Sequence, residues 1–400
     1  MMNNLSLYIH IPFCIRKCHY CDFLSAPCDE ETRQKYVDAL CREIIQRAEE
    51  FQNRKVDTIF FGGGTPSVLS AEQMEQIVST IRRHFQILSD AEISMEMNPG
   101  TVNKEKLETY KKLGINRLSI GLQSADNEEL KILGRIHTWE NFLQTWEMVR
   151  EEGFFNVNID LMSALPGQTL ESYGETLRKV LALKPEHISA YSLIIEEGTQ
   201  FYKWFGEEYE GQSEQVVQGN ATDMNEALSI RKSKALPDEI TDRKMYELTK
   251  TLLEEQGYYR YEISNYALKG YECKHNIGYW KRKEYLGLGL GAASLISDIR
   301  STNITDLQTY LEVGNQKEET KLSATDQMEE FMFLGLRMME GISPTEFEEQ
   351  FGQSLQEVYG TQIAKLEKQG LLEFCRETQR YALTLQGIDV SNQVFVEFIQ

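Results

Sequence analysis

Near the N-terminus the chain reads Leu7-Tyr-Ile-His-Ile11-Pro-Phe-Cys14-Ile-Arg-Lys-Cys18-His-Tyr-Cys21. The apolar residues up to Ile11 predict a β-strand that runs straight into a loop with three cysteines. Three thiolates on one short loop can bind three irons of a cubic [4Fe–4S] cluster, whose usual complement is four, so that the fourth iron stays open to another ligand. We therefore expect a metal site directly after the first strand.

Two other interpretations of this cysteine loop stay open from the residues alone. Structural zinc usually has four tetrahedral ligands, and Cys28 or His19 could complete such a set. Cys18 and Cys21 also have the spacing of a thioredoxin-type redox pair, although Cys14 has no role in that interpretation. The chain has seven cysteines, and this odd count argues against a disulfide framework.

Strands and helices alternate through the first half of the chain. Strands are predicted at Leu7–Ile11, Thr58–Phe61, Glu92–Met97, Arg117–Gly121, Val157–Met162 and His187–Ser192. Helices are predicted between them, at Glu30–Phe51, Ala71–Phe85, Lys104–Leu113, Trp139–Glu152 and Leu170–Leu183. This order predicts an α/β fold with a parallel sheet, best described as a partial or complete βα barrel. In such folds the chemistry gathers at the C-terminal ends of the strands.

The regularity fades after residue 199, and we divide the chain into a barrel (1–205), a polar linker or insertion (206–240), a third region (241–320) and a C-terminal module (321–400). The helices and hairpin of the last module resemble a winged helix. From Pro344 to Gln400 it has four basic residues against nine acidic ones, whereas a DNA-binding surface needs the opposite balance. We therefore interpret it as a packing module.

Composition limits the class of protein further. The 400 residues include 42 Lys and Arg against 62 Asp and Glu, which gives a formal net charge of −20. Because so acidic a surface repels phosphate groups, we expect no nucleic-acid partner. The longest nearly apolar run, 286–296, is too short for an integral membrane segment, and the N-terminus lacks the pattern of a signal peptide. These features predict a soluble, cytoplasmic protein.

Polar or flexible residues stand at the ends of the predicted strands. Gly62-Gly-Gly-Thr65 ends the second strand, where backbone without Cβ atoms can approach a ligand, although a triple glycine alone is often a tight turn. Glu96 closes the third strand and Gln123 follows the fourth, while Arg135 could pair with a carboxylate and Asp160 lies in the fifth strand. Each has a structural alternative, but together they predict one binding pocket.

The segment Tyr8-Ile-His-Ile-Pro-Phe-Cys14-x3-Cys18-x2-Cys21 resembles the cluster loop of radical S-adenosylmethionine (SAM) enzymes of the coproporphyrinogen III oxidase-like branch. The resemblance implies a partial (β/α)6 barrel in which SAM chelates the open iron and is cleaved to a 5′-deoxyadenosyl radical. It also implies Cys14, Cys18 and Cys21 as cluster ligands. The SAM pocket would be lined by Tyr8, Tyr20, Gly63, Gly64, Thr65, Glu96, Gln123, Arg135 and Asp160.

Two related activities share this barrel and cluster in the resembled branch. One is the oxidative decarboxylation of coproporphyrinogen III, and the other is haem handling by HemW-type chaperones. The oxidases carry a further cysteine two residues after the third ligand, where this chain has Phe23. Downstream, Cys273-Lys-His-Asn-Ile-Gly-Tyr-Trp280 matches the His-Asn-x-x-Tyr-Trp signature associated with the chaperones. We therefore expect a haem chaperone, with the oxidase as the alternative.

An imidazole beside aromatic rings suits haem, because histidine is a common axial ligand of haem iron. We therefore predict that region 241–320 contacts haem through His275, with Cys273 as an alternative ligand. The hypothesis implies a haem-requiring client protein as partner, and a homodimer stays open. The following run, Gly287-Leu-Gly-Leu-Gly-Ala-Ala-Ser294, imitates part of a dinucleotide fingerprint, which we reject because no clear strand precedes it and the final glycine is missing.

Overall fold

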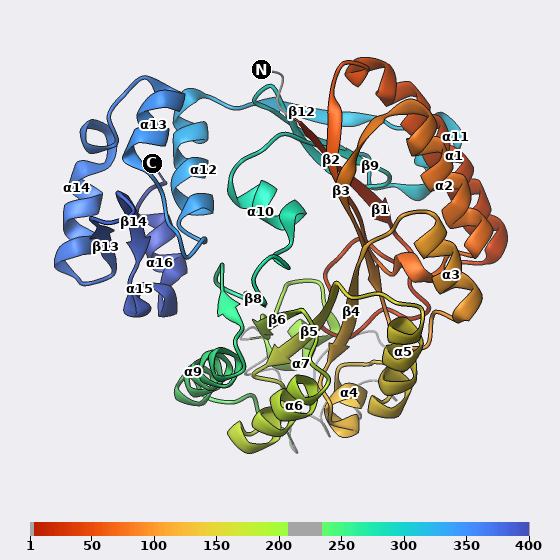
Figure 1. Cartoon of the computed structure of the whole chain (residues 1–400), viewed down its shortest axis with the longest axis horizontal. Coiled ribbons are helices and arrows are strands. Elements are labelled where there is room, and N and C mark those ends of the chain that lie inside the picture. Colours follow the sequence, from red (N-terminus) through yellow and green to blue (C-terminus); the bar gives the residue numbers. More distant parts are fainter. Residues whose placement is uncertain (1–3, 207–233, 400) are drawn as a thin grey trace, which may run out of the picture.

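The computed structural model of the chain, shown in Figure 1, describes residues 4–206 and 234–399. The strands predicted for the barrel are all present, as β1 (Leu5–Ile11), β2 (Lys55–Gly63), β3 (Gln86–Met97), β4 (Arg117–Gln123), β5 (Val157–Ser163) and β6 (His187–Ser192). Each pairs in parallel with the next. The predicted partial (β/α)6 barrel is therefore confirmed. Most of the predicted linker, 206–240, lies outside the described residues.

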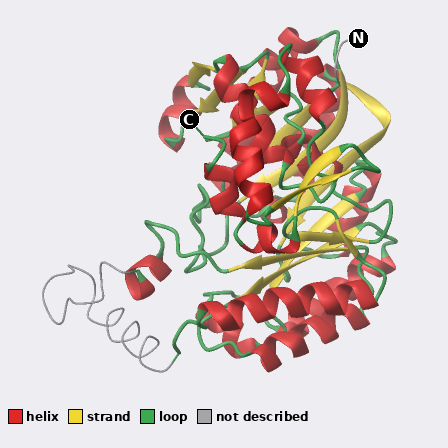
Figure 2. Ribbon diagram, turned by 90° about the vertical axis from the view of Figure 1, so that its left-hand side faces the viewer, coloured by secondary structure: helices red, strands yellow, loops and turns green. Residues whose placement is uncertain are grey.

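Helices follow the strands and cover the outer face of the sheet (Figures 1 and 2). The longer ones are α1 (Glu30–Ala48), α2 (Ala71–His84), α3 (Lys104–Lys112), α5 (Trp139–Glu151) and α6 (Leu170–Ala182). Each begins after a residue whose side chain accepts a hydrogen bond from the first helical turn, as Ser70 does before α2, and this satisfies an otherwise free N–H. The sequence analysis missed the short helices α4 (Asn127–Ile132) and α7 (Gln200–Phe205).

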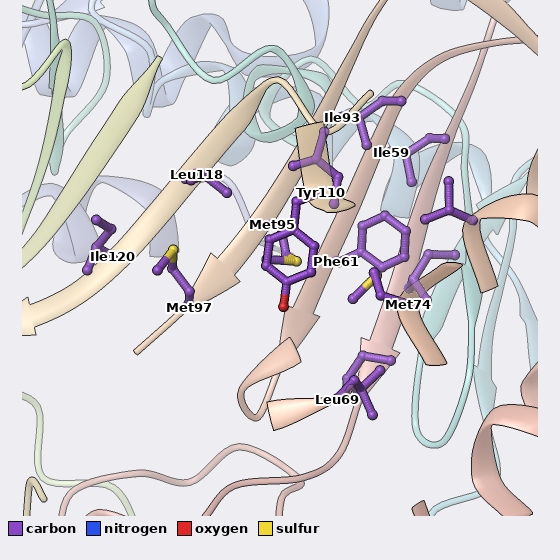
Figure 3. Close-up of a cluster of buried hydrophobic side chains, with 14 of the residues drawn as sticks. Ile59, Phe61, Leu69, Met74, Ile93, Met95, Met97, Tyr110, Leu118 and Ile120 are labelled. Carbon is purple, nitrogen blue, oxygen red and sulfur yellow. The ribbon is translucent and has the colours of Figure 1, made fainter. Parts of the chain in front are cut away.

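The core lies between these helices and the outer face of the sheet. Figure 3 shows alternate residues of β2 and β3, such as Phe61 and Met95, packing against Met74 of α2 and Tyr110 of α3. Successive side chains of a strand point to opposite faces. The residues between the core positions, such as Glu96 of β3, therefore point into the barrel, where a ligand can reach them.

The sheet continues beyond the six predicted strands at both ends. β9 (Tyr285–Leu288) pairs in parallel with β1, and β10 (Ala293–Ile296), β11 (Ile299–Asn303) and β12 (Lys317–Lys321) follow in antiparallel order. At the other end β8 (Asn265–Ala267) pairs with β6, and β7 (Tyr259–Arg260) completes a sheet of twelve strands. Region 241–320 thus contributes strands to both ends of the barrel sheet.

The statement that no clear strand precedes the run from Gly287 is wrong, because Gly287 lies within β9. Glycine is depleted in strands, which hides this one from a pattern search. Here the glycine is required, because a Cβ atom at Gly287 would lie 2.1 Å from the carbonyl oxygen of Ala293. Strand β10 follows instead of a helix, so the dinucleotide-binding interpretation still fails.

The C-terminal module has its own hydrophobic core beside the open side of the barrel (Figure 1). It consists of α12 (Ala324–Gly335), α13 (Pro344–Phe351), α14 (Leu355–Lys368), the hairpin β13 (Leu372–Cys375) and β14 (Arg380–Leu383), α15 (Leu385–Asp389) and α16 (Ser391–Val396). The remaining α-helices of the described residues are α9 (Glu239–Glu255), α10 (Lys274–Trp280) and α11 (Leu307–Val313). In the part of the chain that the structure describes, no helix has the length and apolar character needed to cross a membrane.

A buried carboxylate connects α1 to the added end of the sheet. Glu43 accepts hydrogen bonds from the backbone N–H of Gly289 (2.9 Å), the hydroxyl of Tyr310 (2.6 Å) and the amides of Asn303 and Asn315 (both 2.9 Å). Burial raises the pKa of Glu43, and its hydrogen bonds oppose that shift. One α1 side chain therefore determines how β9, β11 and α11 sit against the barrel.

We predict that Glu43→Ala lowers the free energy of unfolding by roughly 3 kcal/mol, because several buried donors lose their acceptor. Glu43→Gln keeps one acceptor oxygen, so its loss is smaller. Urea denaturation measures both, with Glu49→Ala, an exposed residue near the end of the same helix, as the control. Equal unfolding midpoints for Glu43→Ala and Glu49→Ala would contradict this account.

Candidate functional site

A cavity of about 380 Å³ opens at the C-terminal ends of the parallel strands. It contains most of the predicted site residues, namely Cys14, Cys18, Tyr20, Cys21, Gly63, Gly64, Thr65, Glu96, Gln123, Arg135 and Asp160. These residues come from the ends of β1 to β5 and the loops that follow. The parallel topology therefore brings them together although they are far apart in sequence.

Tyr8 lies elsewhere, although the sequence predicts it in the same pocket. It stands three residues before the end of β1, deeper in the barrel, and lines a different cavity. Its hydroxyl lies 3.0 Å from Nδ1 of His10, and its ring stacks on Phe60 at a centroid distance of 6.4 Å. Tyr8 therefore contributes to the wall behind the first cavity and not to its lining.

His275 lines neither of these cavities. It is 1% exposed, with Nδ1 2.8 Å from Oγ1 of Thr58 and Nε2 2.9 Å from the hydroxyl of Tyr279. Burial, with a smaller contribution from Arg117, lowers the pKa of His275 to about 3, so the ring is neutral. An iron ligand needs an accessible nitrogen lone pair, and both ring nitrogens are already engaged. This arrangement speaks against the predicted role of His275 as haem ligand.

Cys273, the alternative ligand, is also enclosed by protein. It is fully buried, and its Sγ lies 3.6 Å from Oε1 of Glu92. Burial raises the pKa of Cys273 to about 12. A neutral thiol in this position packs as a small apolar side chain.

The three cysteines of the loop are free and partly exposed in the first cavity. Cys14 Sγ lies 3.3 Å from Oγ1 of Thr65, and Nη1 of Arg135 donates to Cys18 Sγ over 3.5 Å. Burial raises the pKa of Cys21 to about 11, so the charge of a bound metal is what would stabilise its thiolate. A cationic guanidinium and a hydroxyl thus already face two of the thiols.

This donor set fits a [4Fe–4S] cluster better than the alternatives. Structural zinc usually has four ligands, and neither Cys28 nor His19 joins the three cysteines in the lining of the cavity. Cluster thiolates bind different irons and need not converge on one point. The redox-pair interpretation leaves Cys14 unexplained, although it lines the same cavity as Cys18 and Cys21.

His19, considered above as a zinc ligand, instead anchors the cluster loop. Its Nδ1 lies 2.9 Å from the carbonyl oxygen of Ile132, and its backbone carbonyl accepts the N–H of Phe201 over 2.9 Å. The ring of Trp204 packs edge-on against the imidazole at 4.8 Å. The sequence analysis missed this role of α7, for which the closely spaced aromatic residues of 201–205 were the available signal.

Two half-buried carboxylates, Glu96 and Asp160, form part of the cavity wall. Burial, reinforced by repulsion from Asp160, raises the pKa of Glu96 to about 8. The backbone N–H of Gly63 donates to Glu96 Oε2 over 3.1 Å, and Asn158 donates to Asp160 over 2.7 Å. Carboxylates in such surroundings attract a cationic ligand, and SAM carries a positive sulfonium and an amino group.

The backbone of the cavity is constrained where it approaches the ligand space. Gly63 has φ +109°, and a Cβ atom there would lie 2.4 Å from the His10 ring, so only glycine fits. Gln123 also has a positive φ of 75°, which is uncommon for a residue with a side chain. An irregular register between Gly121 and Gln123 accompanies it and places the Gln123 side chain in the cavity lining.

Two family models match the chain. The model described as "Radical SAM superfamily" matches residues 8–180, and the one described as "HemN C-terminal domain" matches residues 322–390. The first match covers the loop and the strand ends that line the cavity. It implies a [4Fe–4S] cluster and SAM as cofactors.

Similar proteins extend over nearly the whole chain. "Heme chaperone HemW" of Lactococcus lactis subsp. lactis (strain IL1403) is 36% identical, over 98% of this chain and 97% of that protein. "Heme chaperone HemW" of Escherichia coli (strain K12) is 34% identical, over 93% of each chain. The solved coproporphyrinogen III oxidase HemN from Escherichia coli has a TM-score of 0.80 and 24% identity, over 99% of this chain and 90% of that one, which shows a shared fold.

The raised pKa of Glu96 predicts a pH-dependent stability in the protein without SAM. Between the ordinary value of 4.5 and about 8 the folded state binds more protons at this residue than the unfolded state, so stability falls as the pH rises. Glu96→Gln resembles the protonated form and removes this component. We expect the melting temperature of the variant, relative to the wild type, to rise steadily from pH 5 to pH 8 and to be higher by at least about 2 °C more at pH 9 than at pH 5. A constant difference across this range would contradict the assignment.

The cysteine assignment predicts a selective loss of iron. After anaerobic reconstitution, Cys14→Ser, Cys18→Ser and Cys21→Ser each lack a cluster ligand and should lose most of their iron and acid-labile sulfide. Cys28→Ser is the matched control, because Cys28 lies near the same loop but not in the cavity lining, and it should retain about four irons per chain. Loss of iron from Cys28→Ser as well would indicate a four-cysteine site.

Proposed function

Because this chain belongs to the family of heme chaperones called HemW, we propose that it binds haem and delivers it to a haem-requiring client protein. The observation that carries this proposal is the similarity to HemW chaperones over nearly the whole chain. We also propose that the first cavity holds the cluster on Cys14, Cys18 and Cys21, with SAM beside it. The client would be a protein and not a nucleic acid, in keeping with the net charge of −20.

The residues of the first cavity would have separate roles toward these cofactors. A radical SAM cluster with bound SAM supplies one-electron chemistry when it is reduced. Arg135 places a positive charge beside Cys18, which offsets the negative charge of the thiolates. Asp160, and Glu96 once a bound cation favours its ionised form, offer negative charge to the cationic part of SAM, and Gly63 lets the backbone approach it closely.

The related oxidase activity is the second candidate. The side chain of Phe23 is 62% exposed and lines the cavity at the position where the resembled oxidases carry a further cysteine. A phenyl ring cannot bind iron or exchange a proton. The residues around the cluster therefore favour the chaperone over the oxidase.

We predict that the reconstituted protein, given SAM, a low-potential reductant and coproporphyrinogen III, forms no protoporphyrinogen. Loaded with haem, it should transfer haem to the apo form of a soluble b-type haem protein at a rate that increases with acceptor concentration. Direct handover requires contact between the two proteins, whereas passive release proceeds at a fixed dissociation rate. Haem-loaded serum albumin is the control for passive release. Catalytic porphyrin product, or a rate independent of the acceptor, would overturn the proposal.

A further inference from the structure

A second cavity of about 310 Å³ lies where the added strands of the sheet meet the C-terminal module. Its walls come from β1, β9, β10, β11, the end of α10 and α12. The side chains that shape it include Tyr8, Tyr279, Trp280, Tyr285, Leu295 and Leu334. None of the roles derived above for the cluster or for SAM uses this cavity.

Its walls suit a flat, apolar ligand. The rings of Tyr279 and Tyr285 meet edge to face at a centroid distance of 4.6 Å, and Leu295 and Leu334 add aliphatic surface. Aromatic side chains offer large rigid faces on which an aromatic ring system stacks. The indole N–H of Trp280 is buried and has no hydrogen-bond partner among the described residues.

The same cavity contains two arginines, in a chain whose net charge is strongly negative. Arg282 is committed to the fold, because it donates to Glu330 over 2.7 Å and to Asp298 over 3.2 Å and its side chain is only 6% exposed. Arg300 pairs with the other oxygen of Glu330 at 2.9 Å, yet 42% of its side chain is exposed. Arg300 can therefore offer its remaining N–H groups to a carboxylate at the mouth of the cavity.

Haem combines these properties, since it is a flat aromatic macrocycle with two propionate groups at one edge. The first cavity is already assigned to the cluster and SAM. The second is smaller than a whole haem, so a haem in it would keep one edge exposed. An exposed edge suits a ligand that must be handed to another protein.

We propose that haem binds in this second cavity, against Tyr279, Trp280 and Tyr285, with its propionate edge at Arg300. This inference rests on the proposed chaperone function and assigns its cargo site. His275 then acts as a positioning residue, because its Nε2 lies 2.9 Å from the Tyr279 hydroxyl and fixes that ring from behind. Among the described residues that line the cavity there is neither a histidine nor a cysteine.

The test uses the full chain with its cluster reconstituted and ferric haem as the probe, titrated under identical conditions for the wild type and each variant. Ala293 lines the cavity from β10, and Ala293→Phe fills it without removing a contact. We expect haem affinity to fall roughly tenfold or more by steric exclusion. Ala182→Phe is the matched control on an exposed position of α6 and should bind haem like the wild type. Leu334→Trp fills the cavity from α12 and checks the result independently.

Two further variants separate the contributions. Arg300→Met should weaken protoporphyrin IX binding about threefold, while the affinity for its dimethyl ester, which lacks the carboxylates, stays unchanged. His275→Gln keeps hydrogen-bonding groups toward Thr58 and Tyr279, so the absorption spectrum of bound haem should stay that of the wild type. A changed spectrum would restore His275 as the ligand and overturn the proposed site.

The remaining outcomes tell an incorrect haem site apart from an incorrect function. Wild-type affinity in both Ala293→Phe and Leu334→Trp would overturn the site and leave the chaperone function standing. Failure of the wild type itself to bind haem would overturn the proposed function. Iron content and SAM binding, which report on the first cavity, should be the same in all variants. If one cavity variant loses iron or SAM binding, its haem affinity is not interpreted, and the other cavity variant decides the test.

Discussion

The interior of the barrel depends on the carboxylate of Glu92, which is buried on the inner face of β3 and holds the start of α10. It accepts hydrogen bonds from the backbone N–H groups of Lys274 (3.0 Å) and His275 (3.2 Å), which are the free donors at the start of α10. Arg117, buried on the neighbouring strand, supplies the compensating charge. Since buried charge without a partner is costly, these groups fix α10 inside the barrel.

Because α10 is fixed at its start, the residues along it have defined positions. Within α10, His275 stacks on Phe60 of β2 at 5.2 Å, and Trp280 at its end lies near Arg337, whose guanidinium is 4.4 Å from the indole ring. The helix also contacts α12, so it connects the barrel to the C-terminal module. The second cavity exists because α10 ends between the added strands and that module.

The sequence predicted the features that follow from periodicity and from local motifs. Strand β1 and its cysteine loop are contiguous in sequence, and the ends of parallel strands share one edge of a sheet. Most residues of the first cavity could therefore be predicted from the sequence. The strand β9 could not be predicted, because its glycine, Gly287, is required by the close approach of the Ala293 carbonyl, which is a tertiary contact. The burial of His275 could not be predicted from the sequence either, because a signature of residue types does not show which face of a helix is buried. Tyr8 shows the same limit. It stands three residues before the end of β1, and the sequence does not say how deep in the barrel a strand residue lies.

Tyr8 lines the second cavity, and with His10 and Phe60 it forms a wall toward Gly63 in the lining of the first. The Tyr8 hydroxyl bonds to His10, whose other nitrogen lies 3.0 Å from the carbonyl oxygen of Leu24 and whose ring closes over Gly63. An oxidase must bring its substrate within reach of the radical formed at SAM, which requires one shared space. A chaperone must keep its cargo away from that chemistry, because a radical beside a porphyrin would modify it. Under the proposed assignment, the wall separates the haem from the radical site, and this separation is what the chaperone function requires and the oxidase function forbids.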